Sequence, residues 1–225
     1  MKISDCDVFI YIGGESDEWV SDALKQATNK NMIVVNLIDA LGDKIKHEEH
    51  VEGMEAEHEH DDADEIEADE HVWLSLKNSQ ILCDAITDAL TKAAPAQADT
   101  LKKNSAAYKG KLAALEKNYR DALATAQGKT LLFGDRFPFR YLVDDYGLKY
   151  FAAFSGCSAE TEASFQTITF LSGKVDELNL PCVMTIEGTN HKIAETIIAN
   201  TAAKNQKFWC STPYKEKSTA KRTCR

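Results

Sequence analysis

The sequence has no run of apolar residues that approaches the roughly 18 needed to span a bilayer. Its first residues turn polar at once, so no signal peptide is evident, and taken alone this start suggests a cytosolic protein. It also has no G-x-S-x-G, P-loop or HExxH pattern, the motifs that would indicate an enzyme. Its 225 residues, 44% of them hydrophobic, can fill the cores of one or two ordinary domains.

Two further absences narrow the class of protein. The six cysteines form no CxxC pair, which argues against a zinc ribbon or a thioredoxin-like motif. No clustered basic surface is evident in the body of the chain, so we expect no nucleic-acid partner. Basic residues gather only in residues 211–225, which we interpret as a disordered or foreign tail.

The negative charge of the chain is concentrated in residues 43–70. This segment holds fourteen acidic residues and two lysines, a net charge of −12, whereas the whole chain carries −10 and the remainder therefore +2. It has almost no large apolar residues and cannot bury enough surface to fold alone. We therefore expect a long flexible loop here.

The sequence on either side of this loop alternates between β and α patterns. In a first lobe, residues 1–95, we expect strands over 7–12 and 32–37 and helices over 19–27 and 77–92. Ser75 is the expected N-cap of the last helix. The strand–helix–strand order predicts a right-handed parallel unit. Because the sheet begins so abruptly at residue 7, we expect this lobe to be partial.

Residues 96–127 predict one long linking helix, since they contain no proline and are rich in Ala, Lys, Leu and Glu. About thirty helical residues span roughly 45 Å, which suits a rod between two lobes. A coiled-coil dimer is the alternative, but the a/d pattern is not sustained over enough heptads, and we expect a monomer. In a second α/β lobe, residues 128–210, we expect strands over 130–133, 149–154 and 181–186 and helices over 139–146, 163–178 and 192–204.

Histidine is the strongest indication of function. Five of the six histidines lie within 25 positions of one another, interleaved with carboxylates: His47, His50, His58, His60 and His71. Such mixed donors suit zinc, and imidazole also suits copper, nickel and iron. Calcium is a weaker alternative, because no DxDxDG-type loop is present. We interpret the four histidines inside the loop as a loose collecting site; the alternative is a solvated acidic loop with incidental histidines.

Residues 69–75, with the sequence DEHVWLS, resemble the D-x-H-x-W-(L/M)-(S/D) signature of the metal-binding proteins of zinc and manganese ABC transporters. A His/Asp/Glu-rich loop just before this signature is typical of the zinc members. Residues 3–11 and 18–20, residues 159–164 and residues 185–197 resemble further segments of that family in the same order. The resemblance covers residues 1 to about 205. Beyond these residues the sequence no longer resembles the family.

This resemblance implies two α/β lobes joined by a long helix, with a metal ion in the cleft between them. It implies an extracytoplasmic protein, periplasmic or a cell-surface lipoprotein, that captures Zn²⁺ and delivers it to an ABC transporter permease without enzymatic activity. Mn²⁺ is the alternative cargo. A metal-buffering or adhesin-type protein on the same scaffold remains an alternative function, as does an enzyme with an unrecognised cleft site.

The family supplies about four metal ligands, of which one maps cleanly, to His71. The first would precede Met1, so on this resemblance the chain begins inside the first lobe. The third falls near Asp135, which we take as the candidate because Arg136 cannot ligate a cation. The fourth would lie beyond residue 205. Glu187, a carboxylate at the end of a second-lobe strand, is a further candidate ligand, with a hydrogen-bonding role as the alternative.

Overall fold

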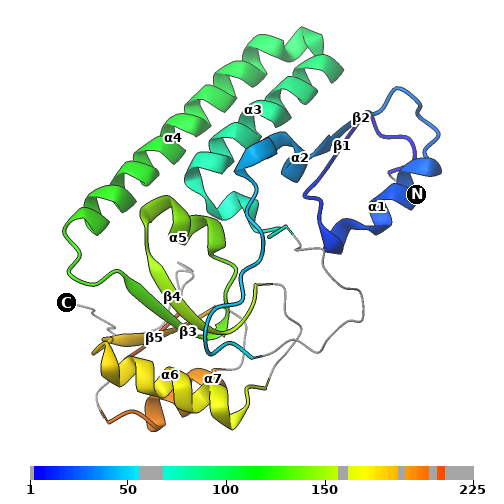
Figure 1. Cartoon of the computed structure of the whole chain (residues 1–225). Coiled ribbons are helices and arrows are strands. Elements are labelled where there is room, and N and C mark those ends of the chain that lie inside the picture. The colour runs from blue at the N-terminus through cyan, green and yellow to red at the C-terminus, as the bar shows by residue number, and fades with distance from the viewer. Residues whose placement is uncertain (1–2, 56–67, 157–161, 187–190, 203–206, 211–225) are drawn as a thin grey trace, which may run out of the picture.

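The computed structural model describes residues 3–55, 68–156, 162–186, 191–202 and 207–210. In this part of the chain two separate parallel sheets are connected by a pair of long helices (Figure 1). No helix within the described ranges is long and apolar enough to cross a membrane. The tail, residues 211–225, lies outside the described residues.

The first lobe has the predicted strand–helix–strand unit. β1 (Val8–Tyr11) pairs in parallel with β2 (Ile33–Asn36), and α1 (Trp19–Lys25) connects them. The Asn36 side chain accepts a hydrogen bond from the Asp39 backbone N–H and so begins α2 (Leu37–Leu41) directly after the strand. Every residue of β1 and β2 is partly exposed.

The long helix pair follows this lobe. α3 (Leu76–Ala93) begins at Ser75, whose hydroxyl accepts the Asn78 N–H as predicted for an N-cap. α4 (Ala98–Ala124) has 27 residues, which is about 40 Å of helix, and it packs against α3. Figure 1 shows α4 running beside α3 and then descending toward the second sheet. The prediction of one long connecting helix is confirmed.

The second lobe has a four-stranded parallel sheet with the order β4-β3-β5-β6. Its strands are β3 (Thr130–Arg136), β4 (Lys149–Phe154), β5 (Cys182–Thr185) and β6 (Lys207–Cys210). Its helices are α5 (Arg140–Tyr146), α6 (Phe165–Glu177) and α7 (Lys192–Ala199). β6 was not predicted, and β3 continues three residues beyond its predicted end.

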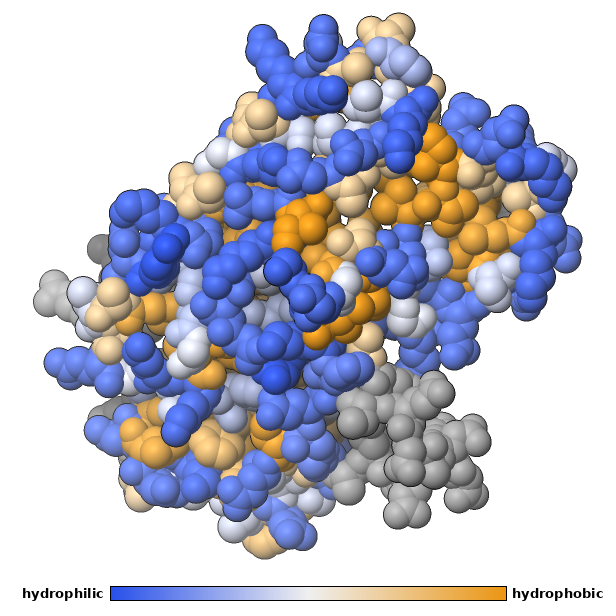
Figure 2. All heavy atoms as spheres, turned by 45° about the horizontal axis from the view of Figure 1, so that its top comes forward, coloured by the Kyte–Doolittle hydropathy of each residue, from blue (hydrophilic) through white to orange (hydrophobic). Residues whose placement is uncertain are grey.

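Both faces of this sheet are covered. α6 and α7 lie on the face that holds Leu132, together with Leu171 and Ile197 from the two helices. The next residue, Phe133, points to the opposite face, because side chains alternate along a strand. The second lobe therefore has a buried core on each side. By contrast, Figure 2 shows hydrophobic areas at the surface toward the upper right, over the first lobe.

The first part of the acidic loop is more ordered than the sequence predicts. We name its described ends, residues 44–55 and 68–70, the loop stem. Met54 is only 7% exposed and, with Val51, packs in the second lobe's cluster. The Glu55 N–H donates to the Ala153 carbonyl oxygen at 2.9 Å. Residues 44–55 are therefore not a free flexible loop, because their few apolar side chains bury themselves against the second sheet.

Candidate metal site

His71 lies where the chain leaves the acidic loop and enters a 3-10 turn, Val72–Leu74. Its backbone N–H donates to Asp69 Oδ1 at 2.8 Å, and its Nδ1 lies 3.0 Å from the same oxygen. The Asp69 side chain is 3% exposed and the His71 side chain 19%. A carboxylate that holds Nδ1 fixes the tautomer and leaves Nε2 as the nitrogen that can bind a metal. The described residues give Nε2 no hydrogen-bond partner.

The second lobe approaches His71 closely through Gly156, two residues after β4. A Cβ atom added at Gly156 would lie 3.3 Å from His71 Cε1 and 3.1 Å from the Phe137 carbonyl oxygen. Both contacts are tighter than most contacts of a Cβ atom, so a side chain at position 156 would require the ring or the backbone to shift by a few tenths of an ångström. Trp73 lies on the same turn as the histidine, with its ring centroid 5.6 Å from the imidazole. His71 is therefore at the junction of the lobes.

Asp135 is buried at the end of β3, with an exposed fraction of 7%. Its Oδ1 accepts the Arg136 N–H at 2.9 Å, and its Oδ2 accepts the Ile186 N–H at 3.0 Å. The carboxylate thus ties the end of β3 to the residue that follows β5. Each oxygen accepts one backbone hydrogen and keeps a second lone pair, so these bonds orient the carboxylate without excluding a metal ion. Its role as a ligand stays a prediction.

The histidines of the loop stem are exposed. His47 forms an isolated antiparallel bridge with Ala68, which closes the stem, and His50 follows three residues later. His58, His60 and Glu187 lie outside the described residues. Within the described ranges, no three His, Cys, Asp or Glu side chains come together in a way that could hold a metal ion. The structure therefore shows one oriented histidine, and the metal-binding role of His71 and of the other candidates stays a prediction.

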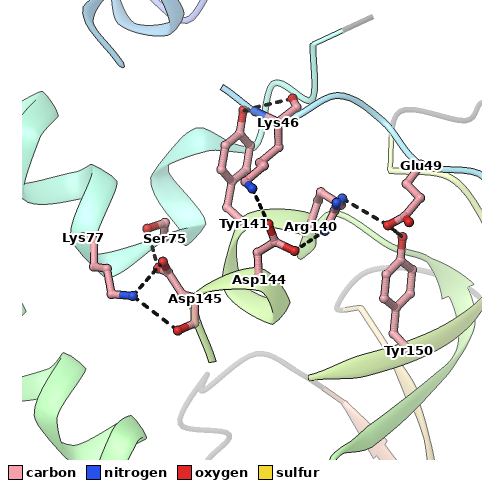
Figure 3. A network of polar contacts seen from close by, with 9 residues as sticks. All are labelled: Lys46, Glu49, Ser75, Lys77, Arg140, Tyr141, Asp144, Asp145 and Tyr150. Carbon is pink, nitrogen blue, oxygen red and sulfur yellow. Dashed lines mark hydrogen bonds and ion pairs between the residues drawn. The ribbon is translucent and has the colours of Figure 1, made fainter. Parts of the chain in front are cut away.

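A network of polar side chains attaches the loop stem to the second lobe (Figure 3). Lys46 Nζ lies 2.5 Å from Asp144, and Arg140 Nε lies 3.2 Å from Glu49. The Tyr150 hydroxyl donates to Glu49 at 3.4 Å. Burial would by itself raise the pKa of Asp144, but hydrogen bonds from Lys46 and Arg140 outweigh it and leave that pKa below its ordinary value.

A second group of contacts ties the start of α3 to α5 (Figure 3). The Ser75 hydroxyl donates to Asp145 at 2.6 Å, and Lys77 Nζ lies 3.1 Å from the same carboxylate. A carboxylate at a helix N-terminus is favoured by the helix dipole. The α5 helix therefore contacts both the loop stem and the first lobe.

Asp69 belongs to the sequence signature, but the sequence alone assigned it no role; the structure shows that its carboxylate holds the His71 ring. A carboxylate two residues before a histidine can reach its ring when the chain turns between them, so the D-x-H spacing was the signal. The partnership between Asp145 and Ser75 had no such signal, because 70 positions separate the two residues.

The two parallel sheets, the long connecting helix and the oriented histidine between the lobes define a solute-binding protein of the two-lobed α/β type. The chain belongs to the ZnuA family, described as zinc-uptake complex component A, periplasmic, whose model matches residues 1–222. The match extends beyond residue 205, where the resemblance we saw in the sequence ends.

Named relatives agree with this membership. The chain is 32% identical over 211 residues to the zinc-binding protein AdcA of Streptococcus pyogenes serotype M3, with 90% of this chain and 40% of AdcA aligned. It is 32% identical to the high-affinity zinc uptake system protein ZnuA of Bacillus subtilis, with 91% and 63% aligned. The chain thus spans less than two thirds of these curated relatives.

Among solved structures, the Zn(II)-bound ZnuA-like domain of Streptococcus pneumoniae AdcA superposes with a TM-score of 0.65 at 28% identity. The superposition covers 93% of this chain and 69% of that one. The predicted fold class, two α/β lobes with a long helix between them, is confirmed.

Proposed function

We propose that this chain captures Zn²⁺ outside the cytoplasm and delivers it to the permease of an ABC transporter, with His71 as a ligand of the ion. The observation that carries the proposal is the His71–Asp69 pair: a buried carboxylate holds Nδ1 at 3.0 Å and so presents Nε2 at the junction of the lobes. Metal-bound histidines almost always donate their other ring N–H to a carboxylate, a backbone carbonyl or water, and such a partner orients the ring and raises its basicity.

The histidine richness of the acidic loop and its edge favours zinc over manganese. Imidazole suits zinc, whereas manganese prefers carboxylate, carbonyl and water oxygens. The two relatives that are 32% identical are named as a zinc-binding protein and a zinc uptake protein, which supports the same choice. The binding cycle involves no bond making in a substrate, so the protein is a carrier and has no catalytic residues.

The ligands besides His71 come from the second lobe in this proposal, with Asp135 and Glu187 as candidates. Asp135 lies at the carboxyl end of β3, the edge of a parallel sheet at which ligands usually bind. The loop histidines His47, His50, His58 and His60 form a weaker collecting site that raises the local concentration of the ion. The chain works as a monomer, and the ion passes from it to the permease.

Competitive equilibrium dialysis tests the proposal. The purified chain is dialysed against equal, limiting concentrations of Zn²⁺, Mn²⁺ and Ca²⁺, and the metal retained per chain is measured by mass spectrometry. We expect one tightly held Zn²⁺ per chain, with additional Zn²⁺ lost on further dialysis, and no retained Ca²⁺. Preferential retention of Mn²⁺, or retention of no metal at all, would contradict the proposal.

A further inference from the structure

Tyr141 belongs to the second lobe but is buried in the first. It is the second residue of α5 and is 3% exposed. Its ring packs in a cluster whose other buried members come from the first lobe: Ile38, Leu41, Val72 and Leu82. A large side chain in this position fixes α5 against the first lobe, because the cluster cannot keep its packing if the ring moves.

The Tyr141 hydroxyl joins the two arms of the loop stem (Figure 3 shows its contact with Lys46). The Lys46 N–H donates to the phenol oxygen at 3.1 Å, and the hydroxyl donates to the Asp69 carbonyl oxygen at 2.9 Å. The Lys46 carbonyl oxygen lies farther from the hydroxyl, at 3.3 Å, than the Asp69 carbonyl oxygen does, so the single phenol proton goes to Asp69. Burial raises the pKa of Tyr141, which keeps this proton in place at neutral pH.

We infer that Tyr141 is a positioning residue for His71: its hydroxyl fixes the backbone at Asp69, and the Asp69 carboxylate then holds the imidazole in its metal-binding orientation. The inference rests on the proposed zinc function of His71. Two hydrogen bonds connect the residues, from the Tyr141 hydroxyl to the Asp69 carbonyl oxygen and from His71 Nδ1 to Asp69 Oδ1. The second lobe thereby sets the orientation of a ligand that the first lobe carries.

The other contacts between the loop stem and α5 do not fix Asp69 or orient His71. Lys46 pairs with Asp144 and Glu49 pairs with Arg140, but both pairs hold the first arm of the stem and neither contacts Asp69. The Lys46 side chain is 43% exposed and that of Glu49 46%, and ion pairs this exposed contribute little. Tyr141 is thus the described α5 side chain that contacts the residue holding His71.

The chain offers two matched controls for Tyr141→Phe. Tyr146 lies on the same helix, and its buried hydroxyl has no hydrogen-bond partner among the described residues, so Tyr146→Phe removes an oxygen without removing a bond. Tyr150→Phe removes a hydroxyl that contacts Glu49 on the stem but not Asp69. Only Tyr141→Phe breaks the connection to His71.

Each variant is measured for its thermal midpoint, for the His71 tautomer by nitrogen-15 NMR of the metal-free chain, and for its zinc association constant by chelator competition. We expect Tyr141→Phe to lower the share of the Nδ1–H tautomer and to weaken zinc binding roughly tenfold, the lower end of the cost of losing an outer-shell partner. Both control variants should leave the tautomer and the zinc constant at their wild-type values.

The outcomes separate this inference from the proposed function. If Tyr141→Phe lowers only the thermal midpoint, Tyr141 is structural and the inference is wrong, whereas zinc binding by the wild type still supports the function. If the wild type binds no zinc but Tyr141→Phe shifts the tautomer, the positioning role stands and the function fails. Should Tyr141→Phe not fold, 3-fluorotyrosine at position 141 keeps the hydroxyl but alters its hydrogen-bond strength. The His71 nitrogen shifts must then move, and 3-fluorotyrosine at position 146 must leave them unchanged.

Discussion

Replacing Asp69 with asparagine separates the charge of this side chain from its shape. Asparagine keeps an oxygen that can accept the His71 N–H, now at 2.8 Å, so the turn should form. It loses the negative charge that lies 3.0 Å from Nδ1 in a side chain that is 3% exposed. Removing such a partner from a metal-bound histidine costs about 10- to 100-fold in affinity, which is about 1.4 to 2.7 kcal/mol.

The assay is zinc competition against a chromophoric chelator at constant pH, with the thermal midpoint measured in parallel. Asp17→Asn is the control, because the Asp17 side chain also accepts backbone N–H groups, those of Ile12 and Gly13 at 3.0 Å each, but has no contact with His71. We expect Asp69→Asn to weaken zinc binding within that range and Asp17→Asn to leave it unchanged. Equal zinc affinities for Asp69→Asn and the wild type would refute the reasoning that Asp69 prepares the histidine.

Three further predictions concern the loop, the ion pairs and the core. Replacing His58 and His60 together with alanine should reduce the number of weakly bound zinc ions and leave the tightest phase of a titration unchanged. If this double variant weakens the tightest phase more than His71→Ala does, the ligand assignment is wrong. Asp144→Asn should lower the free energy of unfolding at pH 7 by about 0.5 kcal/mol, a value reduced for solvent exposure. The pKa of Asp144 in the folded protein lies below its ordinary value of 3.8. The difference in stability between the wild type and Asp144→Asn is therefore fully present above pH 3.8 and disappears as the pH falls through the pKa of the folded protein. Urea unfolding at several pH values would show this loss. Leu171→Ala, at a side chain with 0% exposure in the α6 face of the core, should cost about 2 to 5 kcal/mol by the same measurement, and a cost below 1 kcal/mol would contradict the packing described.

The secondary structure of this chain was largely predictable because its signals are local. The apolar run of residues 32–37, the N-cap at Ser75 and the proline-free stretch before Gly128 each gave an element close to its observed bounds. β6 was missed, since it is identified by pairing with β5 in the sheet and not by its own short sequence. The continuation of β3 was missed because it passes through Gly134, where a Cβ would lie 2.6 Å from the Ala194 Cα of α7.

Contacts between segments that are distant along the chain could not be predicted from the sequence. Nothing near Met54 indicates that it packs on the second lobe, and nothing near Tyr141 indicates that it enters a first-lobe cluster. The same holds for Asp135, whose oxygens accept N–H groups from two segments 50 positions apart. His71 was identifiable because the D-x-H spacing places its partner carboxylate within reach of the ring along a single turn.

Calorimetric titration of the wild-type chain and of His71→Ala with Zn²⁺, side by side, tests the central claim most directly. The claim is that His71 is the ordered ligand and that the loop histidines only collect the ion. We therefore expect one tight phase of one ion per chain in the wild type, its loss in His71→Ala, and weaker phases that persist in both. An unchanged tight phase in a folded His71→Ala protein would contradict the claim and would assign zinc binding to other residues.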